Sequence, residues 1–265
     1  MFTLENVILT YHQKTLLDIP QLSIQEGAFT ALIGPNGAGK TTLLNLLAGD
    51  LSPTTGRISF QEKPLAQYSV MELATRRSVL PQTEHIPFAI KAKAVILMGI
   101  MPFGVSPHHP KAEALLTQLS QQLELDSIIN RPYQHLSGGE QHRVQIARVL
   151  LQALFSLEES PNLQERIMLL DEPFNHLDLY HQKQLLRYFK QLTEAGLTII
   201  CVMHDINHAL QIADQIILLQ NGVIQGTYTP AELWHSKILS QLFKVDFVTL
   251  QHPENPDFST LAFKV

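Results

Sequence analysis

The sequence is poor in cysteine and in long apolar runs. Its 265 residues include a single cysteine, Cys201, so no disulfide can form within the chain and a reducing compartment is expected. Cys201 lies in the apolar run 198–203, which predicts a buried strand thiol. The longest uncharged apolar stretch, 94–107, contains Pro102 and Gly104 and is shorter than the ~20 residues of a membrane span. Any membrane contact is therefore expected through a partner.

An excess of positive charge is also missing. The chain has 19 Lys and Arg against 24 Asp and Glu, a formal net charge of -5. It therefore lacks the overall field that attracts nucleic acid or anionic lipid, and we expect no nucleic-acid partner. The residues after Met1 do not form a basic segment followed by an apolar one, which predicts no signal peptide. With 45% hydrophobic residues, the composition is that of a globular protein.

Short β-branched runs alternate with helical patterns along much of the chain. The runs 29–33 and 198–203 each lead into a helical pattern, and further runs occupy 167–170 and 216–219. Such alternation is typical of an α/β protein with a largely parallel sheet. The polar segment 155–165 interrupts the alternation and is predicted to be a surface loop.

Two segments depart from the alternation. Residues 2–10 and 15–24 alternate more loosely, which predicts antiparallel strands beside the main sheet. Between about 84 and 152 the strand signals thin out and apolar residues recur at spacings of three and four, which predicts an inserted helical lobe. We therefore expect one domain with a core lobe of residues 1–83 and 153–265 and a helical lobe of residues 84–152.

A glycine-rich segment connects the run 29–33 to a helical pattern. Residues 34–41 read Gly-Pro-Asn-Gly-Ala-Gly-Lys-Thr and fit G-x-x-x-x-G-K-[ST] in the strand-to-helix context that this motif requires. Glycines let backbone N–H groups turn toward phosphate oxygens, and the helix N-terminus adds partial positive charge. Lys40 is expected to reach the terminal phosphates and Thr41 to bind Mg²⁺. The predicted nucleotide-binding residues are Gly34, Pro35, Asn36, Gly37, Ala38, Gly39, Lys40, Thr41 and Thr42.

Two acids end the apolar run 167–170. Asp171 is suited to hold Mg²⁺ through water, and Glu172 to orient or deprotonate an attacking water. An Asp-Glu pair after an apolar run is by itself equally well a common strand exit. The phosphate loop upstream favours the catalytic interpretation.

A third motif precedes a helix whose apolar residues share one face. The turn Ser137-Gly138-Gly139-Glu140 offers a hydroxyl and glycine N–H groups at the helix start, a second phosphate-binding surface. Alone, this turn is more often a simple helix cap. Together, the phosphate loop, this turn and the Asp-Glu pair, in this order and spacing, resemble the ATP-binding cassette family over essentially all of residues 1–265.

The resemblance implies a fold and an activity. The expected fold is a P-loop NTPase cassette of the α/β class with a RecA-like, mostly parallel sheet core, an N-terminal antiparallel β subdomain and an inserted α-helical subdomain. The expected activity is hydrolysis of ATP with ATP and Mg²⁺ as cofactors. Glu172 resembles the catalytic acid of the family. Gln82 resembles the glutamine that contacts Mg²⁺ and the attacking water, and Asp171 the acid that holds Mg²⁺.

Further roles also come from the resemblance. Tyr11 matches the aromatic residue that stacks on adenine, with an ordinary strand aromatic as the alternative. His204 resembles the switch histidine that contacts the γ-phosphate and holds the catalytic acid. Two metal ligands at His204 and His208 are the disfavoured alternative. Asp178 matches the loop residue that contacts an opposite cassette. The remaining histidines scatter without ligand spacing and are expected to be surface residues.

The resemblance to the ATP-binding cassette family also implies that two cassettes form a dimer. The chain carries one cassette and no internal repeat of 20 to 50 residues, so the second must come from another chain. Ser137, Gly138, Gly139 and Glu140 of one chain are expected to meet the nucleotide on the phosphate loop of the other. A homodimer is the favoured arrangement.

Several stretches narrow the resemblance to a class of importers. Residues 79–82, 145–150 and 204–208 resemble importers of iron chelates, haem and cobalamin, and residues 155–165 and 245–253 most resemble haem-importer ATPases. This implies integral membrane permease subunits, a substrate-binding protein, and a peripheral location at the cytoplasmic face of the inner membrane.

Alternatives to haem import stay open. Ferric siderophore or cobalamin import differs only in a cargo that this subunit does not touch. Soluble cassettes of translation or of iron–sulfur cluster assembly are more remote. The apolar stretch 86–103 is expected to line a permease groove or to be plain core.

Overall fold

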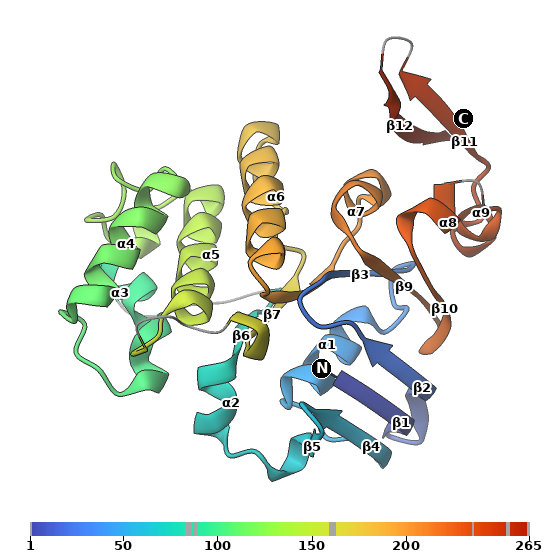
Figure 1. Ribbon diagram of the computed structural model, residues 1–265, viewed down its shortest axis with the longest axis horizontal. Coiled ribbons are helices and arrows are strands. Elements are labelled where there is room, and N and C mark those ends of the chain that lie inside the picture. Colours follow the sequence, from blue (N-terminus) through green and yellow to red (C-terminus); the bar gives the residue numbers. More distant parts are fainter. Residues whose placement is uncertain are drawn as a thin grey trace. The chain divides into compact units, whose positions relative to one another are not determined.

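The computed structural model describes residues 2–82, 86, 89–158, 163–234, 236–252 and 255–263. Contacts divide the chain into two compact units. The first comprises residues 1–65 and 200–265, and the second comprises residues 66–199. Figure 1 shows the elements along the chain. The boundaries predicted for the helical lobe, residues 84–152, lie inside the second unit and stay a prediction.

A mixed sheet dominates the first unit. Strand β1 pairs antiparallel with β2 and with β4, and β3 runs parallel to β9. All residues of β3 are buried, as expected for a run of apolar and β-branched side chains covered on both faces. Within the first unit the strands of this sheet, in spatial order, are β5 (Lys63–Pro64), β4 (Thr55–Phe60), β1 (Phe2–Tyr11), β2 (Lys14–Ile24), β10 (Val223–Tyr228), β9 (Gln215–Gln220) and β3 (Phe29–Ile33).

The helices of the first unit are short. They are α1 (Lys40–Ala48), α7 (Ile206–Ile212), α8 (Pro230–Trp234) and α9 (Ile238–Phe243). Helix α1 buries four leucines, Leu43, Leu44, Leu46 and Leu47. Burial of each such side chain contributes about 1.5–3 kcal/mol, so the core fixes the helix that follows the glycine-rich loop. Strands β11 (Phe247–His252) and β12 (Asn255–Phe263) form a separate antiparallel hairpin.

The second unit is mainly helical. Strands β6 (Arg77–Leu80) and β7 (Ile167–Asp171) pair in parallel, and helix α5 packs against both strands and against α3 and α4. A Cβ on Gly99 would lie 2.4 Å from the Arg148 carbonyl oxygen, so this glycine permits close backbone packing on α5. The helices are α2 (Val70–Arg76), α3 (Ala92–Leu97), η2 (Met98–Phe103), α4 (Pro110–Gln122), η3 (Tyr133–His135), α5 (Gly138–Leu154), η4 (Leu163–Glu165) and α6 (Leu179–Glu194).

The fold confirms the α/β class and the antiparallel N-terminal strands. Strand β8 (Thr198–Val202) is entirely buried, and Cys201 is buried within it as predicted. Part of the predicted surface loop, residues 159–162, lies outside the described residues. No helix in the described part of the chain is long and apolar enough to span a membrane.

Candidate functional site

The glycine-rich loop wraps around its own lysine. Lys40 Nζ donates to the carbonyl oxygens of Gly34 and Pro35 at 2.8 and 3.1 Å. A Cβ on Gly34 would lie 2.0 Å from the Leu219 carbonyl oxygen, so only glycine fits beside β9. Gly39 has φ 103°, a left-handed conformation that also favours glycine. The loop therefore curls around the lysine amine in a compact shape that depends on glycine at positions 34 and 39.

The start of α1 is suited to bind an anion. Gly39 is the N-cap and gives no side-chain cap, and the first turn contains no acidic residue. A Cβ on Gly37 would meet no atom within 4 Å, so the loop is open on that side. Helix N–H groups, the helix dipole and the lysine all favour a phosphate here. The residues present therefore fit the phosphates of a nucleotide.

The other two predicted residues of the first unit are exposed. Tyr11, at the end of β1, is 65% exposed, and its ring lies edge-on to His12 at 4.3 Å. His204 follows β8 and is also exposed. The N–H of the preceding Met203 donates to the Leu32 carbonyl at 3.1 Å, which holds the end of β8 beside the strand that leads into Gly34. Both aromatic rings are accessible to a ligand.

The acidic motif lies at the end of β7 in the second unit. Asp171 is 2% exposed, whereas Glu172 is half-buried with φ 54°. A glutamate in this left-handed conformation costs roughly 1–2 kcal/mol, a strain found most often at functional sites. Gln82 Nε2 donates to Glu172 Oε1 at 3.5 Å, and the Asn175 amide donates to Glu172 Oε2. The structure thus brings Gln82 and Glu172 together, with two amides orienting one carboxylate.

The Ser-Gly-Gly-Glu turn caps α5, with Ser137 and Gly138 exposed and Gly139 and Glu140 half-buried. Ser137 Oγ accepts from the Glu140 N–H at 3.3 Å, and Glu140 Oε2 accepts from the Ser137 N–H at 2.7 Å. The hydrogen bonds from Ser137, with lesser help from Arg131, lower the pKa of the Glu140 carboxyl below its ordinary value. A Cβ on Gly138 would meet nothing within 4 Å. The turn is a capping box that leaves Gly138 open, whereas a Cβ on Gly139 would lie 2.8 Å from the His176 carbonyl oxygen.

Asp178 caps the next helix. Its Oδ1 accepts from the His181 N–H at 2.9 Å and from His181 Nδ1 at 2.8 Å. These two bonds lower the pKa of the Asp178 carboxyl, which stays ionised and largely exposed. The residue predicted to contact an opposite cassette is therefore a fixed surface anion.

For two histidines, the prediction of a surface position was wrong. His142 and His181 were expected to be surface residues, but both are half-buried and bonded to neighbouring elements. Scattered single histidines give no sequence signal of this kind. The spacing of Gly139, His142 and Arg143, which places all three on one helix face, is the signal that sequence reasoning missed.

The donor chemistry of the predicted magnesium ligands fits that ion. Thr41, Gln82 and Asp171 offer hydroxyl, amide and carboxylate oxygens, the hard ligands that Mg²⁺ prefers. Thr41 belongs to the first unit, and Gln82 and Asp171 belong to the second. Their joint role stays a prediction.

Comparison with known proteins gives a consistent family. The ABC transporter family pattern matches residues 17–175. The hemin import ATP-binding protein HmuV of Hahella chejuensis (strain KCTC 2396) is 37% identical over 91% of this chain and 92% of its own length. HmuV of Escherichia coli O157:H7 is 35% identical over 96% of each chain.

Solved structures agree. An ATP-binding cassette in a dimeric post-hydrolysis state with ADP and Pi has a TM-score of 0.74 and 28% identity, covering 87% of this chain and 99% of that one. An inward-facing metal-chelate type ABC transporter shares the fold with a TM-score of 0.76 at 24% identity, covering 100% and 97%. With its phosphate loop, its Ser-Gly-Gly-Glu turn and its acidic strand end, this chain belongs to the ABC transporter family as an ATP-binding cassette ATPase.

Proposed function

We propose that this chain is the ATP-hydrolysing subunit of an importer that takes up haem through a membrane permease. The observation that carries the proposal is the carboxylate of Glu172, held by Gln82 and Asn175 directly after the buried Asp171. Two curated relatives of nearly equal length are named for hemin import. Together they support an ATPase whose cargo is haem.

The nucleotide is held by the phosphate loop and stacks on Tyr11. The residues of the 34–42 loop other than Pro35 supply backbone N–H groups, and Lys40 places its charge on the terminal phosphates. Thr41, Gln82 and Asp171 would hold Mg²⁺, which would neutralise charge at the phosphates. Glu172 orients the attacking water and accepts its proton. His204 contacts the γ-phosphate.

A second copy of the chain completes each site. Ser137, Gly138, Gly139 and Glu140 of one chain meet the nucleotide of the other, and Asp178 lies at the same interface. The dimeric relative with ADP and Pi supports this arrangement. The open Gly138 face and the exposed Asp178 carboxylate support it as well.

The permease contacts an apolar surface of the second unit. Val70 and Met71 at the start of α2 are 77% and 58% exposed, and Met98 and Met101 of η2 are 36% and 68% exposed. Helix α2 contacts η2, so the four side chains belong to neighbouring elements. Exposed methionines make adaptable apolar contacts. Because of this exposed apolar surface, we place the subunit at the cytoplasmic face of the inner membrane. A substrate-binding protein completes the system.

Uptake measurements test the cargo. In a strain lacking the gene, wild-type chain should restore ATP-dependent uptake of labelled haem, and the Glu172→Gln variant should not. The exposed substitution His108→Asn is a matched control that should behave as wild type. Restored uptake of a ferric siderophore or cobalamin, with none of haem, would overturn the haem assignment and leave the importer. Ferric siderophore and cobalamin are the alternative cargoes.

A further inference from the structure

One face of α5 meets the segment that follows Glu172. Gly139, His142 and Arg143 lie at spacings of three and four residues, which places them on one side of the helix. A Cβ on Gly139 would lie 2.8 Å from the His176 carbonyl oxygen. His142 Nε2 lies 2.8 Å from the Pro173 carbonyl oxygen, and Arg143 contacts His181. All three residues on this face of α5 therefore lie against residues 173–181.

His142 donates a hydrogen bond to the segment that follows Glu172. A carbonyl oxygen only accepts, so Nε2 carries the proton. Burial is the largest influence and lowers the pKa of the His142 imidazole, the hydrogen bond to the Pro173 carbonyl raises it by less, and nearby His176 lowers it slightly further. The ring of His142 lies edge-on to that of His176, 6.2 Å away. The backbone one residue beyond Glu172 is thus fixed to the helix that begins at the Ser137 turn.

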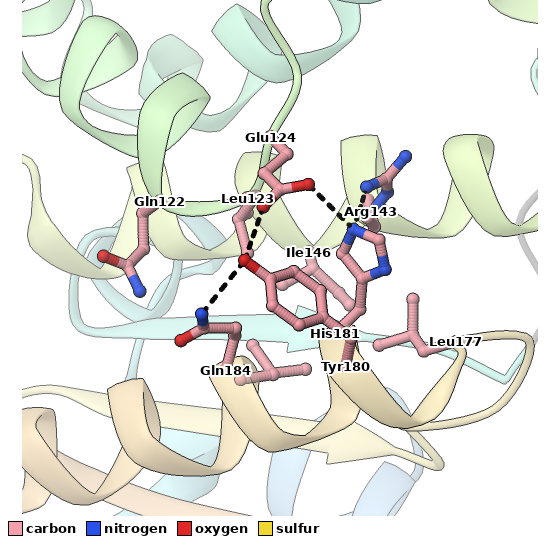
Figure 2. A pocket seen from close by; sticks show the side chains of 10 residues that line it. Gln122, Leu123, Glu124, Arg143, Ile146, Leu177, Tyr180, His181 and Gln184 are labelled. Atoms are coloured by element: carbon pink, nitrogen blue, oxygen red, sulfur yellow. Dashed lines mark hydrogen bonds and ion pairs between the residues drawn. The ribbon is translucent and has the colours of Figure 1, made fainter.

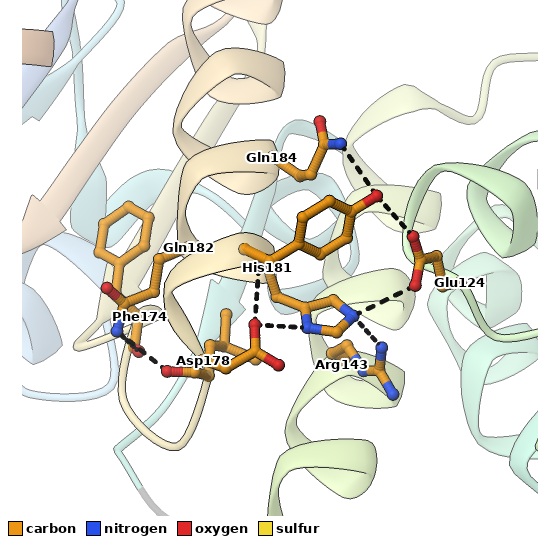
Figure 3. Close-up of polar contacts among 9 residues, drawn as sticks. Glu124, Arg143, Phe174, Asp178, His181, Gln182 and Gln184 are labelled. Atoms are coloured by element: carbon orange, nitrogen blue, oxygen red, sulfur yellow. Dashed lines mark hydrogen bonds and ion pairs between the residues drawn. The ribbon is translucent and has the colours of Figure 1, made fainter.

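His181 bridges three elements (Figure 3). Its Nδ1 donates to Asp178 Oδ1 at 2.8 Å, which leaves the Nε2 lone pair to accept from Arg143 Nη1. Glu124 Oε2 lies 3.6 Å from Nε2, and Glu124 Oε1 accepts from the Tyr180 hydroxyl at 2.8 Å. The end of α4, the face of α5 and the start of α6 therefore converge on one imidazole.

A small pocket beside His181 is lined by the same groups. Figure 2 shows Tyr180 and His181 of α6 facing Glu124 and Arg143 across it. Leu123, Ile146 and Leu177 line its apolar side.

We propose that His142 and His181 are positioning residues that hold residues 173–178 against α5, so that Asp178 and the Ser137 turn meet a second cassette as one rigid surface. The proposal rests on the proposed ATPase dimer and adds residues that do not touch nucleotide. Without the two imidazoles, the turn and Asp178 would move independently. Closure of the dimer would then lose precision while each phosphate loop kept its own nucleotide.

Steady-state kinetics of the purified chain separate positioning from binding. His142→Ala and His181→Ala should each lower kcat about tenfold while KM for ATP stays within about twofold, because misplacement affects the closed dimer rather than nucleotide binding. In the Glu172→Gln background, the same variants should weaken the ATP-dependent dimer measured by sedimentation velocity. The control His108→Asn lies on an exposed loop and should change neither value.

A matched pair at His142 remains informative if an alanine variant fails to fold. A glutamine amide nitrogen reaches the place of Nε2, whereas an asparagine amide nitrogen reaches only that of Nδ1. His142→Gln should therefore keep wild-type kcat, and His142→Asn should lose it at similar Tm. Equal kcat in the pair, or kcat of both alanine variants equal to His108→Asn, would overturn the proposal. Failure of the wild-type chain to hydrolyse ATP would instead overturn the proposed function on which it rests.

Discussion

At the scale of single residues, the chemistry depends on how a few side chains are held. Glu172 directly follows the fully buried strand β7, and its own backbone has a left-handed conformation. Two side-chain amides hold its carboxylate. The Asp-Glu pair was predictable from sequence because two acids after an apolar run are easily recognised. The strain at Glu172 and the donation from Asn175 were not, since they depend on the turn that residues 172–176 form.

Replacement of Glu172 tests its assignment. Glu172→Gln should lower the ATP hydrolysis rate about 100-fold or more, because it removes the water-activating carboxylate, and should leave ATP binding intact. The measurements are phosphate release and binding of a fluorescent ATP analogue. Asn175→Ala is an informative partner, since it removes only an orienting amide and should have a smaller effect. Undiminished turnover in Glu172→Gln would contradict the catalytic role.

The buried imidazole of His142 should make the stability of the chain depend on pH. Its pKa is lower in the folded chain than in the unfolded chain, so the folded state binds its proton less readily. The contribution of His142 to the free energy of unfolding is therefore fully present above pH 6.5, the pKa of the group in the unfolded chain. It is lost as the pH falls from there through the lower pKa of the folded chain. Wild-type Tm should fall from about pH 7 to pH 5 more steeply than that of His142→Gln, which keeps a donor but does not titrate. Parallel Tm curves would contradict this account.

At the scale of elements, the phosphate loop and α1 were predicted almost to the residue. The helix begins at Lys40 as expected, because glycines end the strand and buried leucines then set a helical face. Strand β6 and the hairpin of β11 and β12 were not predicted. Arg77–Leu80 is too short to show a period, and the hairpin depends on contacts with residues far away in the chain.

Lys40→Ala tests the loop as an element. The lysine amine bridges the Gly34 and Pro35 carbonyls and is placed to reach phosphates, so its removal should weaken ATP affinity at least tenfold. Equilibrium binding measures the effect. Lys111→Ala, which removes an exposed lysine amine in α4, is the control. Unchanged affinity in Lys40→Ala would argue against the phosphate-loop assignment.

The hairpin makes a prediction about local stability. An isolated two-stranded hairpin is marginal, and Asn207 ties this one to α7 through bonds of 2.7 and 3.1 Å to the Leu261 backbone. Asn207→Ala should therefore speed amide exchange in residues 247–252 about tenfold or more, since it frees two backbone groups. Gln225→Ala, on exposed strand β10, should not. Exchange equal to wild type would show that other contacts hold the hairpin.

At the scale of the whole molecule, function requires partners that the sequence indicates only through family resemblance. Under the proposed function other subunits recognise the cargo, so the haem assignment rests on the similarity to the hemin-import relatives. The exposed apolar residues of α2 and η2 became recognisable only once the fold showed which of the many apolar side chains remain exposed. Sequence thus predicted the chemistry of the cassette more fully than its surfaces.

Co-purification of tagged Glu172→Gln chain from detergent-solubilised membranes with MgATP tests the central claim most directly. The account predicts that mass spectrometry identifies a polytopic membrane permease, retained because hydrolysis is blocked while the nucleotide stays bound. Recovery of soluble ribosomal or iron–sulfur assembly proteins alone would contradict the importer and leave only the ATPase.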